Sequence, residues 1–209
     1  TGVVATDSTG VGSARYQIMG TEFGGDQGIF AFGYLSQPGP TGFVGMTNLV
    51  SNSGVVSADV TKVGVVKGAG AGCEYGGDKG IFALGYNNVG ANPSTWSNLV
   101  SNTGVMASDL SLPGGVTARN EPAACEYGTQ TGIFGFGTID GRVSITNLVS
   151  STGVIASDQA ATTGTVRSAT MACSFGEDKG IFGYGSGSNI SITNLVSNTG
   201  VVADDVAGT

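Results

Sequence analysis

The chain has 209 residues, of which 38 are glycine, and a formal net charge of −7 from eight basic and fifteen acidic side chains. So few Lys and Arg argue against nucleic acid or an anionic membrane surface as a partner, and no apolar run is long enough to insert in a membrane. The sequence has no histidine, which excludes imidazole-based catalysis and histidine-ligated metal sites. We therefore expect a protein that is not an enzyme and that uses no cofactor or metal.

The sequence repeats itself about every fifty residues, and this period predicts the architecture. Each copy holds a GIF segment that ends in glycine, then an Asn-Leu-Val segment, then a polar turn and a GVV-type segment. We expect one domain over residues 1–209, with repeats at approximately 8–59, 60–109, 110–158 and 159–205. Residues 1–7 copy the end of the last repeat. This surplus terminal strand indicates either a segment of a longer array or a strand that pairs with a neighbouring subunit.

The residue pattern predicts four strands in each repeat. In the first repeat they lie at 15–21, 28–33, 47–50 and 54–56. The third and fourth are joined by a polar run that closes on glycine, which is typical of a hairpin with a left-handed glycine. Four antiparallel strands in each fifty-residue repeat predict an all-β fold, a β-propeller of four-stranded blades. The corresponding strands of the other repeats are 67–73, 80–85, 97–100, 104–106; 119–125, 132–137, 146–149, 153–155; 167–173, 180–185, 193–196 and 200–202.

The order of these segments resembles a kelch-type repeat. One departure is that Tyr34, Tyr86, Thr138 and Ser186 stand where the kelch pattern has the second glycine of a pair. The stretches EYGGDKGIFALGY (Glu74–Tyr86) and SITNLVSNTGVVADD (Ser191–Asp205) also resemble repeat arrays in the tail or fibre proteins of tailed bacteriophages. This resemblance implies a virion structural protein, located on the virion or outside the cell, whose partners are other virion subunits or further copies of itself.

Charged residues recur at fixed positions, which allows two interpretations. They form either a ring that lines a channel and binds a polar ligand, or one structural pair of an Asp or Glu with a basic residue in each blade. Because every copy has the pattern, we expect the structural pair. The residues are Asp7, Asp59, Asp109, Asp158 and Asp205; Arg15, Lys67, Arg119 and Arg167; and Glu22, Glu74 and Glu126, with Ser174 in the last repeat.

Three other sets of residues are interpreted as scaffold for the same reason. Cys73, Cys125 and Cys173 share one repeat position and lack the close pairing of a zinc site, so we expect buried thiols. Trp96 aligns with aliphatic residues and is expected in the core. Asp26, Asp78 and Asp178 lie in glycine-rich turns that hold one carboxylate each, which favours a tight turn over a calcium site.

The link between the second and third strands breaks the repeat pattern. It covers 12, 10, 7 and 6 residues, at 35–46, 87–96, 139–145 and 187–192, and the four sequences are unrelated. Variable loops on a constant scaffold are a common place for recognition, although variation without function is an equal alternative. The loops offer amide, hydroxyl and aromatic groups suited to a carbohydrate: Tyr34, Gln37, Tyr86, Asn87, Asn88, Asn92, Asp140, Arg142 and Asn189.

These observations support one function above two others. The first hypothesis is a phage tail-fibre or other virion protein that binds a host surface, through a glycan, without covalent chemistry. The alternative is a purely architectural module that builds a fibre or decorates a virion by exchange of terminal strands. An enzyme on a propeller scaffold is disfavoured, because the chain has no histidine and no acid pair confined to one repeat.

Overall fold

The computed structural model describes residues 10–35, 42–61, 64–87, 93–159, 164–187 and 190–207. This part of the chain is all β, and its strands form antiparallel sheets without helices. Within these ranges no helix is long and apolar enough to cross a membrane. The all-β prediction is therefore confirmed. The surplus strand predicted at residues 1–7 lies outside the described residues.

Each repeat forms one antiparallel sheet whose strands pair in chain order. The first sheet consists of β1 (Met19–Phe23), β2 (Gln27–Ala31), β5 (Met46–Val50) and β6 (Val60–Thr61). The third sheet has three strands, with a single bridge between Thr146 and Gln159 where the others have a fourth strand. The main sheets of the other three repeats are β8 (Ala71–Tyr75), β9 (Lys79–Ala83), β11 (Trp96–Val100) and β12 (Leu110–Ser111); β13 (Ala123–Tyr127), β14 (Thr131–Gly135) and β15 (Thr146–Val149); and β16 (Met171–Phe175), β17 (Lys179–Gly183), β18 (Ile192–Val196) and β19 (Val206–Ala207).

The predicted hairpin turns are present, but the fourth strands are displaced. Gly54 closes the first turn with a φ of 77°, in the left-handed region that glycine favours. After it, Val56 makes only one isolated bridge to Val50, and the paired strand β6 begins at Val60. The same interruption recurs in the other repeats, where Val100, Val149 and Val196 make single bridges to Met106, Ile155 and Val202. In every repeat the asparagine of the third strand donates to the carbonyl that follows this bridge, as Asn48 does to Ser57 at 3.1 Å. A side-chain donor thus takes a backbone carbonyl where the sequence predicted a continuous GVV strand.

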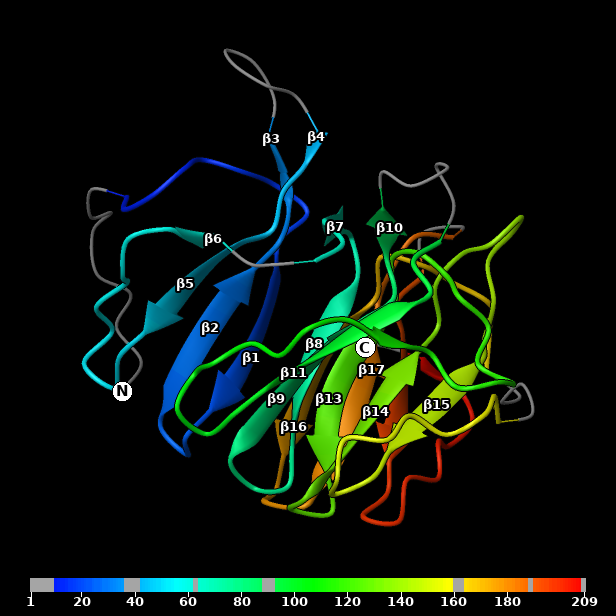
Figure 1. The fold of residues 1–209 in the computed structure, drawn as a ribbon. Coiled ribbons are helices and arrows are strands. Elements are labelled where there is room, and N and C mark those ends of the chain that lie inside the picture. The colour runs from blue at the N-terminus through cyan, green and yellow to red at the C-terminus, as the bar shows by residue number, and fades with distance from the viewer. Residues whose placement is uncertain are drawn as a thin grey trace.

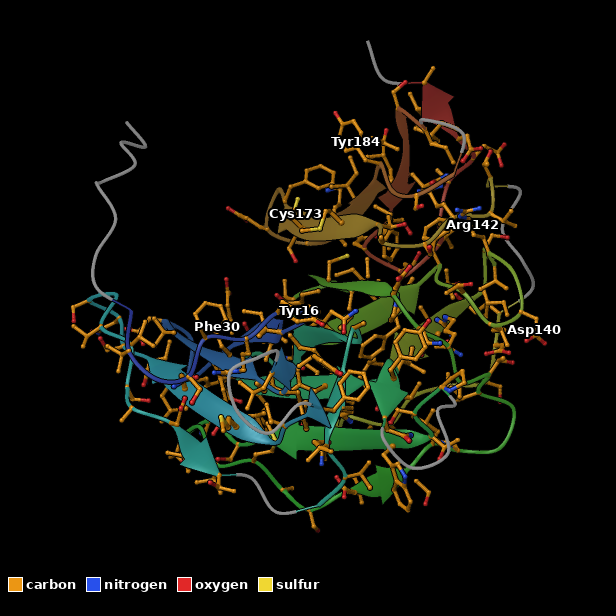
Figure 2. All side chains as sticks on the ribbon, turned by 90° about the horizontal axis from the view of Figure 1, so that it is seen from above. Tyr16, Phe30, Asp140, Arg142, Cys173 and Tyr184 are labelled. Atoms are coloured by element: carbon orange, nitrogen blue, oxygen red, sulfur yellow. The ribbon has the colours of Figure 1, made fainter. Side chains whose placement is uncertain are left out.

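Consecutive sheets pack face to face, and the core lies between them. Phe32 of the first repeat meets Phe82 of the second edge-on, with 5.8 Å between ring centroids. Phe136 and Phe182 repeat this contact between the third and fourth sheets at 5.2 Å. The first strands β1, β8, β13 and β16 lie side by side in that order. Figures 1 and 2 show the four sheets as an arc, with the first and the fourth sheet at its two ends.

Glycine at two repeat positions allows this close packing. A Cβ added to Gly132 would lie 2.5 Å from the Cys73 sulfur, and one added to Gly180 would lie 2.5 Å from the Cys125 sulfur. At the turns, a Cβ on Gly153 would lie 2.9 Å from the Tyr75 ring. These distances leave no room for a side chain. The recurring glycines are therefore required by contact between sheets as well as by turn geometry.

The cysteine prediction holds for two of the three thiols. Cys73 and Cys125 are buried, and burial raises the pKa of Cys125 to about 12. Cys173 is exposed, because no described sheet covers the outer face of the fourth sheet. Trp96 also differs from the prediction: it is half-buried at the start of β11, and its carbonyl accepts a hydrogen bond from Lys67 Nζ at 3.0 Å.

Aspartate, asparagine and the basic residue form a structural lock within a repeat. In the last repeat, Asn194 donates to Asp205 Oδ1 at 2.9 Å and accepts from the buried Arg167. The Arg167 Nη1 atom lies 3.8 Å from Asp205. Although partial burial opposes ionisation, hydrogen bonds from Thr165 and Asn194 and the charge of Arg167 hold the pKa of Asp205 below its usual value. The prediction of a structural pair is confirmed for aspartate in the first and fourth repeats.

The same lock occurs in the first repeat. Arg15 Nη1 lies 3.5 Å from Asp59 Oδ1, and Arg15 Nη2 donates to Asn48 at 2.6 Å. Asn48 in turn donates to Asp59 at 2.9 Å. The basic side chain also connects neighbouring repeats, since the Arg167 guanidinium lies 3.8 Å from the centroid of the Phe136 ring. In the first and fourth repeats the basic side chain is therefore paired with a carboxylate of its own repeat.

We expect Asp158→Ala to lower the free energy of unfolding by about 2 kcal/mol or more, because it leaves the buried Arg119 without its nearby carboxylate. It also removes the acceptor of the Asn147 and Thr117 hydrogen bonds, which measure 2.8 and 3.0 Å. Urea unfolding measures the difference. Asp140→Ala, at an exposed position in the same repeat, is the control and should change stability by less than about 0.5 kcal/mol. Equal effects of the two variants would contradict a structural lock.

Candidate ligand-binding site

The variable loops all leave the same end of the sheets. In Figure 1 the hairpin of β3 (Tyr34–Leu35) and β4 (Gly42–Phe43) and the pair of β7 (Lys67–Gly68) and β10 (Tyr86–Asn87) project from this end. The start of each loop pairs with the segment that precedes the first strand of its own repeat. Examples are Tyr16 with Tyr34 and Asn120 with Thr138. The loop ends are thus anchored to the scaffold.

Four aromatic side chains form a continuous row across the first two repeats. We call Tyr16, Tyr34, Phe43 and Tyr86 the aromatic row. The ring centroids of Tyr16 and Tyr34 are 5.3 Å apart, those of Tyr34 and Phe43 5.1 Å, and those of Phe43 and Tyr86 6.4 Å. Tyr16 is 50% exposed, and the other three are half-buried. Mutual ring contacts hold the row in place while leaving part of it open to solvent.

Sequence reasoning found half of this row. It named Tyr34 and Tyr86, which the structure brings together through Phe43. Tyr16 was missed because it lies in a segment predicted as a scaffold strand. The sequence does mark Tyr16, because the equivalent positions of the other repeats hold Gly68, Asn120 and Ser168. This position therefore varies between repeats, as the loops do. Phe43 lies inside the first variable loop and was passed over in favour of polar neighbours.

The other proposed ligand-binding residues do not join the row. Asn87 is buried, and its backbone pairs with Lys67, so it is not presented to a ligand. Asp140 and Arg142 are exposed in the third repeat, and Arg142 Nη2 donates to Ser186 Oγ at 3.2 Å. Figure 2 shows these two residues well away from Tyr16. The last four proposed residues lie outside the described part of the chain: Gln37, Asn88, Asn92 and Asn189.

A second surface lies where the first strands of all four sheets meet. A pocket of about 320 Å³ is lined by residues from Thr21 in β1 to Ser174 in β16, and it contains Glu22, Glu74 and Glu126. Burial, together with the charges of Glu126, Glu22 and Asp78, raises the pKa of Glu74 to about 7. Burial and Glu22 also raise the pKa of Glu126. The carboxylates thus repel one another across the pocket.

This pocket corrects one part of the sequence interpretation. Asp59 and Asp205 pair with basic residues, whereas the glutamates face one another. Among the described residues, no group of three His, Cys, Asp or Glu side chains is placed to hold a metal ion. In the fourth repeat, Ser174 replaces the glutamate, and its hydroxyl bonds to the Glu126 backbone at 3.1 Å. The carboxylates therefore give this pocket a charge that depends on pH. They do not point to a particular ligand.

Comparison of the sequence with protein-family models and with curated proteins finds no match.

We expect Glu74→Gln to stabilise the protein at pH 8 and not at pH 4. The pKa of Glu74 is raised from 4.5 in the unfolded chain to about 7 in the fold, so wild-type stability falls as pH rises through that window. After allowance for solvent screening, the gain at pH 8 is roughly 1 kcal/mol. Unfolding curves at both pH values measure it. Glu177→Gln, at an exposed turn outside the pocket, serves as control; a pH-independent gain for Glu74→Gln would refute the explanation.

Proposed function

We propose that this protein is a non-enzymatic virion protein of the tail-fibre type found in tailed phages, and that its loop end binds a glycan on the host surface. The observation that carries the proposal is the aromatic row of Tyr16, Tyr34, Phe43 and Tyr86. The phage assignment rests on the resemblance of the repeat motifs. The absence of histidine from the sequence favours binding without covalent chemistry.

The aromatic row has properties that suit a sugar. A tyrosine ring offers an apolar face for the C–H face of a pyranose, and its hydroxyl offers a hydrogen bond at the edge. Tyrosines also bind with little loss of side-chain entropy, because they have only two torsions. The tilted and edge-on ring contacts, with interplanar angles of 49° and 84°, fix the rings before a ligand arrives. Such preorganisation lowers the cost of binding a flexible chain.

We further propose that the four sheets are blades of a β-propeller related to the kelch type. Three features support this architecture. Each fifty-residue repeat is a chain-ordered antiparallel sheet, consecutive sheets pack face to face, and all four first strands line one pocket. In such an arrangement the variable loops of successive blades share one end of the molecule. That end would present the aromatic row to a surface.

The proposed location is the virion or the extracellular space, with other virion subunits or copies of this chain as partners. Neither nucleic acid nor a membrane interior is a proposed partner, in keeping with the net charge of −7 and the few basic residues. The architectural alternative, in which terminal strands are exchanged, depends on residues 1–7. These lie outside the described residues, so strand exchange stays a prediction.

The proposal predicts that the wild-type protein gives signals on an array of bacterial surface glycans and that Tyr16→Ala weakens them. Loss of one stacked ring should reduce affinity about three- to tenfold, as measured by calorimetry with the best glycan of the array. Tyr16 is half exposed, so its removal should leave folding intact. Tyr86→Ala should act in the same direction through the other end of the row.

The matched control is Tyr16→Phe, which keeps the ring and should retain most of the affinity. Replacement of 35–46 and 87–96 together by short Gly-Ser links should abolish the signal. An unchanged glycan profile after both replacements would rule out the loop end as the binding site. Release of new reducing ends from a bound polysaccharide would show an enzyme instead.

A further inference from the structure

The fourth sheet exposes a face that is buried in the other three. On this face Met171 is 72% exposed, Tyr184 60% and Phe175 41%, and Cys173 is exposed as well. Their counterparts in the first repeat are covered by the second sheet, and the same holds in the next two repeats. We call Met171, Cys173, Phe175 and Tyr184 the closing face. Its apolar character is that of an interface between sheets.

The first sheet exposes the opposite face. Phe30 is 41% exposed, whereas its counterparts Phe82, Phe134 and Phe182 are fully buried against the preceding sheet. Val50 and Val56 beside it are half-buried, whereas their counterparts Val100 and Met106 pack into the core between the first two sheets. We call Phe30, Val50 and Val56, with Gly28 and Gly54, the opening face. The chain therefore carries at its two ends the two halves of the contact that it makes three times internally.

The glycines of the opening face are also not covered by another described sheet. At the internal contacts, a Cβ on the equivalent glycines would collide with the preceding sheet, as at Gly132 with Cys73 and at Gly153 with Tyr75. A Cβ on Gly54 would meet nothing within 4 Å, and one on Gly28 would meet only atoms of its own repeat. The first sheet thus keeps the glycines against which a thiol and an aromatic ring pack at the internal contacts. No described sheet packs on these glycines.

Backbone hydrogen bonds give the internal contact its register. In the turns, Gly24 N donates to Asp78 O, Gly76 N to Gln130 O and Gly128 N to Asp178 O, each at 2.8 Å. At the loop end, Gly33, Gly85 and Gly137 donate to the carbonyls of Lys67, Arg119 and Arg167. The next donors in these two series are Gly176 and Gly185 of the fourth sheet, and the next acceptors are Asp26 and Arg15 of the first.

We propose that a second copy of this chain covers the closing face, with its opening face in the register of the internal contacts. Phe30 of the second copy then lies edge-on to Tyr184, its Gly28 receives the Cys173 sulfur, and its Gly54 lies against Phe175. A second copy is the occupant because it supplies every glycine and backbone acceptor that this register needs. The contact is head-to-tail, so it closes two copies into a ring if the arc allows and otherwise extends as a filament. It does not depend on glycan binding.

The test uses two variants that each disable one face. Tyr184→Asp places a charge on the closing face, and Phe30→Asp places one on the opening face; both positions are exposed in the single chain, so folding should be kept. By light scattering and sedimentation, the wild-type chain should associate with rising concentration, and each variant alone should stay monomeric. A 1:1 mixture should form a heterodimer and nothing larger, because it offers one intact pair of faces. Circular dichroism checks that both variants are folded.

Val154→Glu is the matched control, since Val154 is an exposed apolar residue of the third repeat outside both faces, and this variant should associate like the wild type. A Gly28→Cys variant tests the register: mild oxidation should link it to Cys173 of a second copy, and Cys173→Ser should abolish the link. A wild-type chain that stays monomeric at all concentrations would overturn the proposal. So would self-association of Phe30→Asp like the wild type, which would indicate pairing of two closing faces, or a mixture that stays monomeric.

Discussion

The close contact between consecutive sheets is the constraint on which the rest of the structure depends. It brings a thiol or threonine and an aromatic ring of one sheet against two glycines of the next, at distances that admit no side chain. The core is made of these contacts, with Phe82, Phe134 and Phe182 each fully buried between two sheets. Because the first strands follow one another closely, the contact also draws Glu22, Glu74 and Glu126 together. The pocket and its raised pKa values are thus consequences of packing.

Much of the fold was predictable because every repeat has the same residue types at its turns and strands. Glycines in fixed places and alternating apolar residues indicated antiparallel hairpins, and the structure contains them. The errors have local causes. In every repeat the asparagine of the third strand takes the carbonyl after the GVV segment, and the fourth strand pairs only further along the chain. Cys173 shares its repeat position with buried thiols but is exposed, since a sequence pattern does not show which repeat lacks a following sheet.

The candidate site was harder to predict, because it depends on contacts between repeats. Tyr34 and Tyr86 are about fifty residues apart, and only the structure shows Phe43 between them. Asn87 looked suited to a ligand by residue type, yet its place in β10 buries it. The sequence likewise did not show that the aspartates and the glutamates take different places in the structure. Both Asp and Glu recur with the basic residues, and only position in the sheet directs Asp205 to Arg167 and Glu74 into the pocket.

The lock of aspartate, asparagine and basic residue also bears on how such a protein changes in evolution. In the first, third and fourth repeats, the carboxylate and the groups that donate hydrogen bonds to it all come from one repeat. In these three repeats the buried cation keeps its carboxylate when a neighbouring repeat is removed or duplicated, and the surfaces that meet afterwards are the same. Such a chain gains or loses length in whole repeats without redesign of its polar interior, as in modular repeat proteins. Repeat number is thus open to selection separately from the sequences of the variable loops.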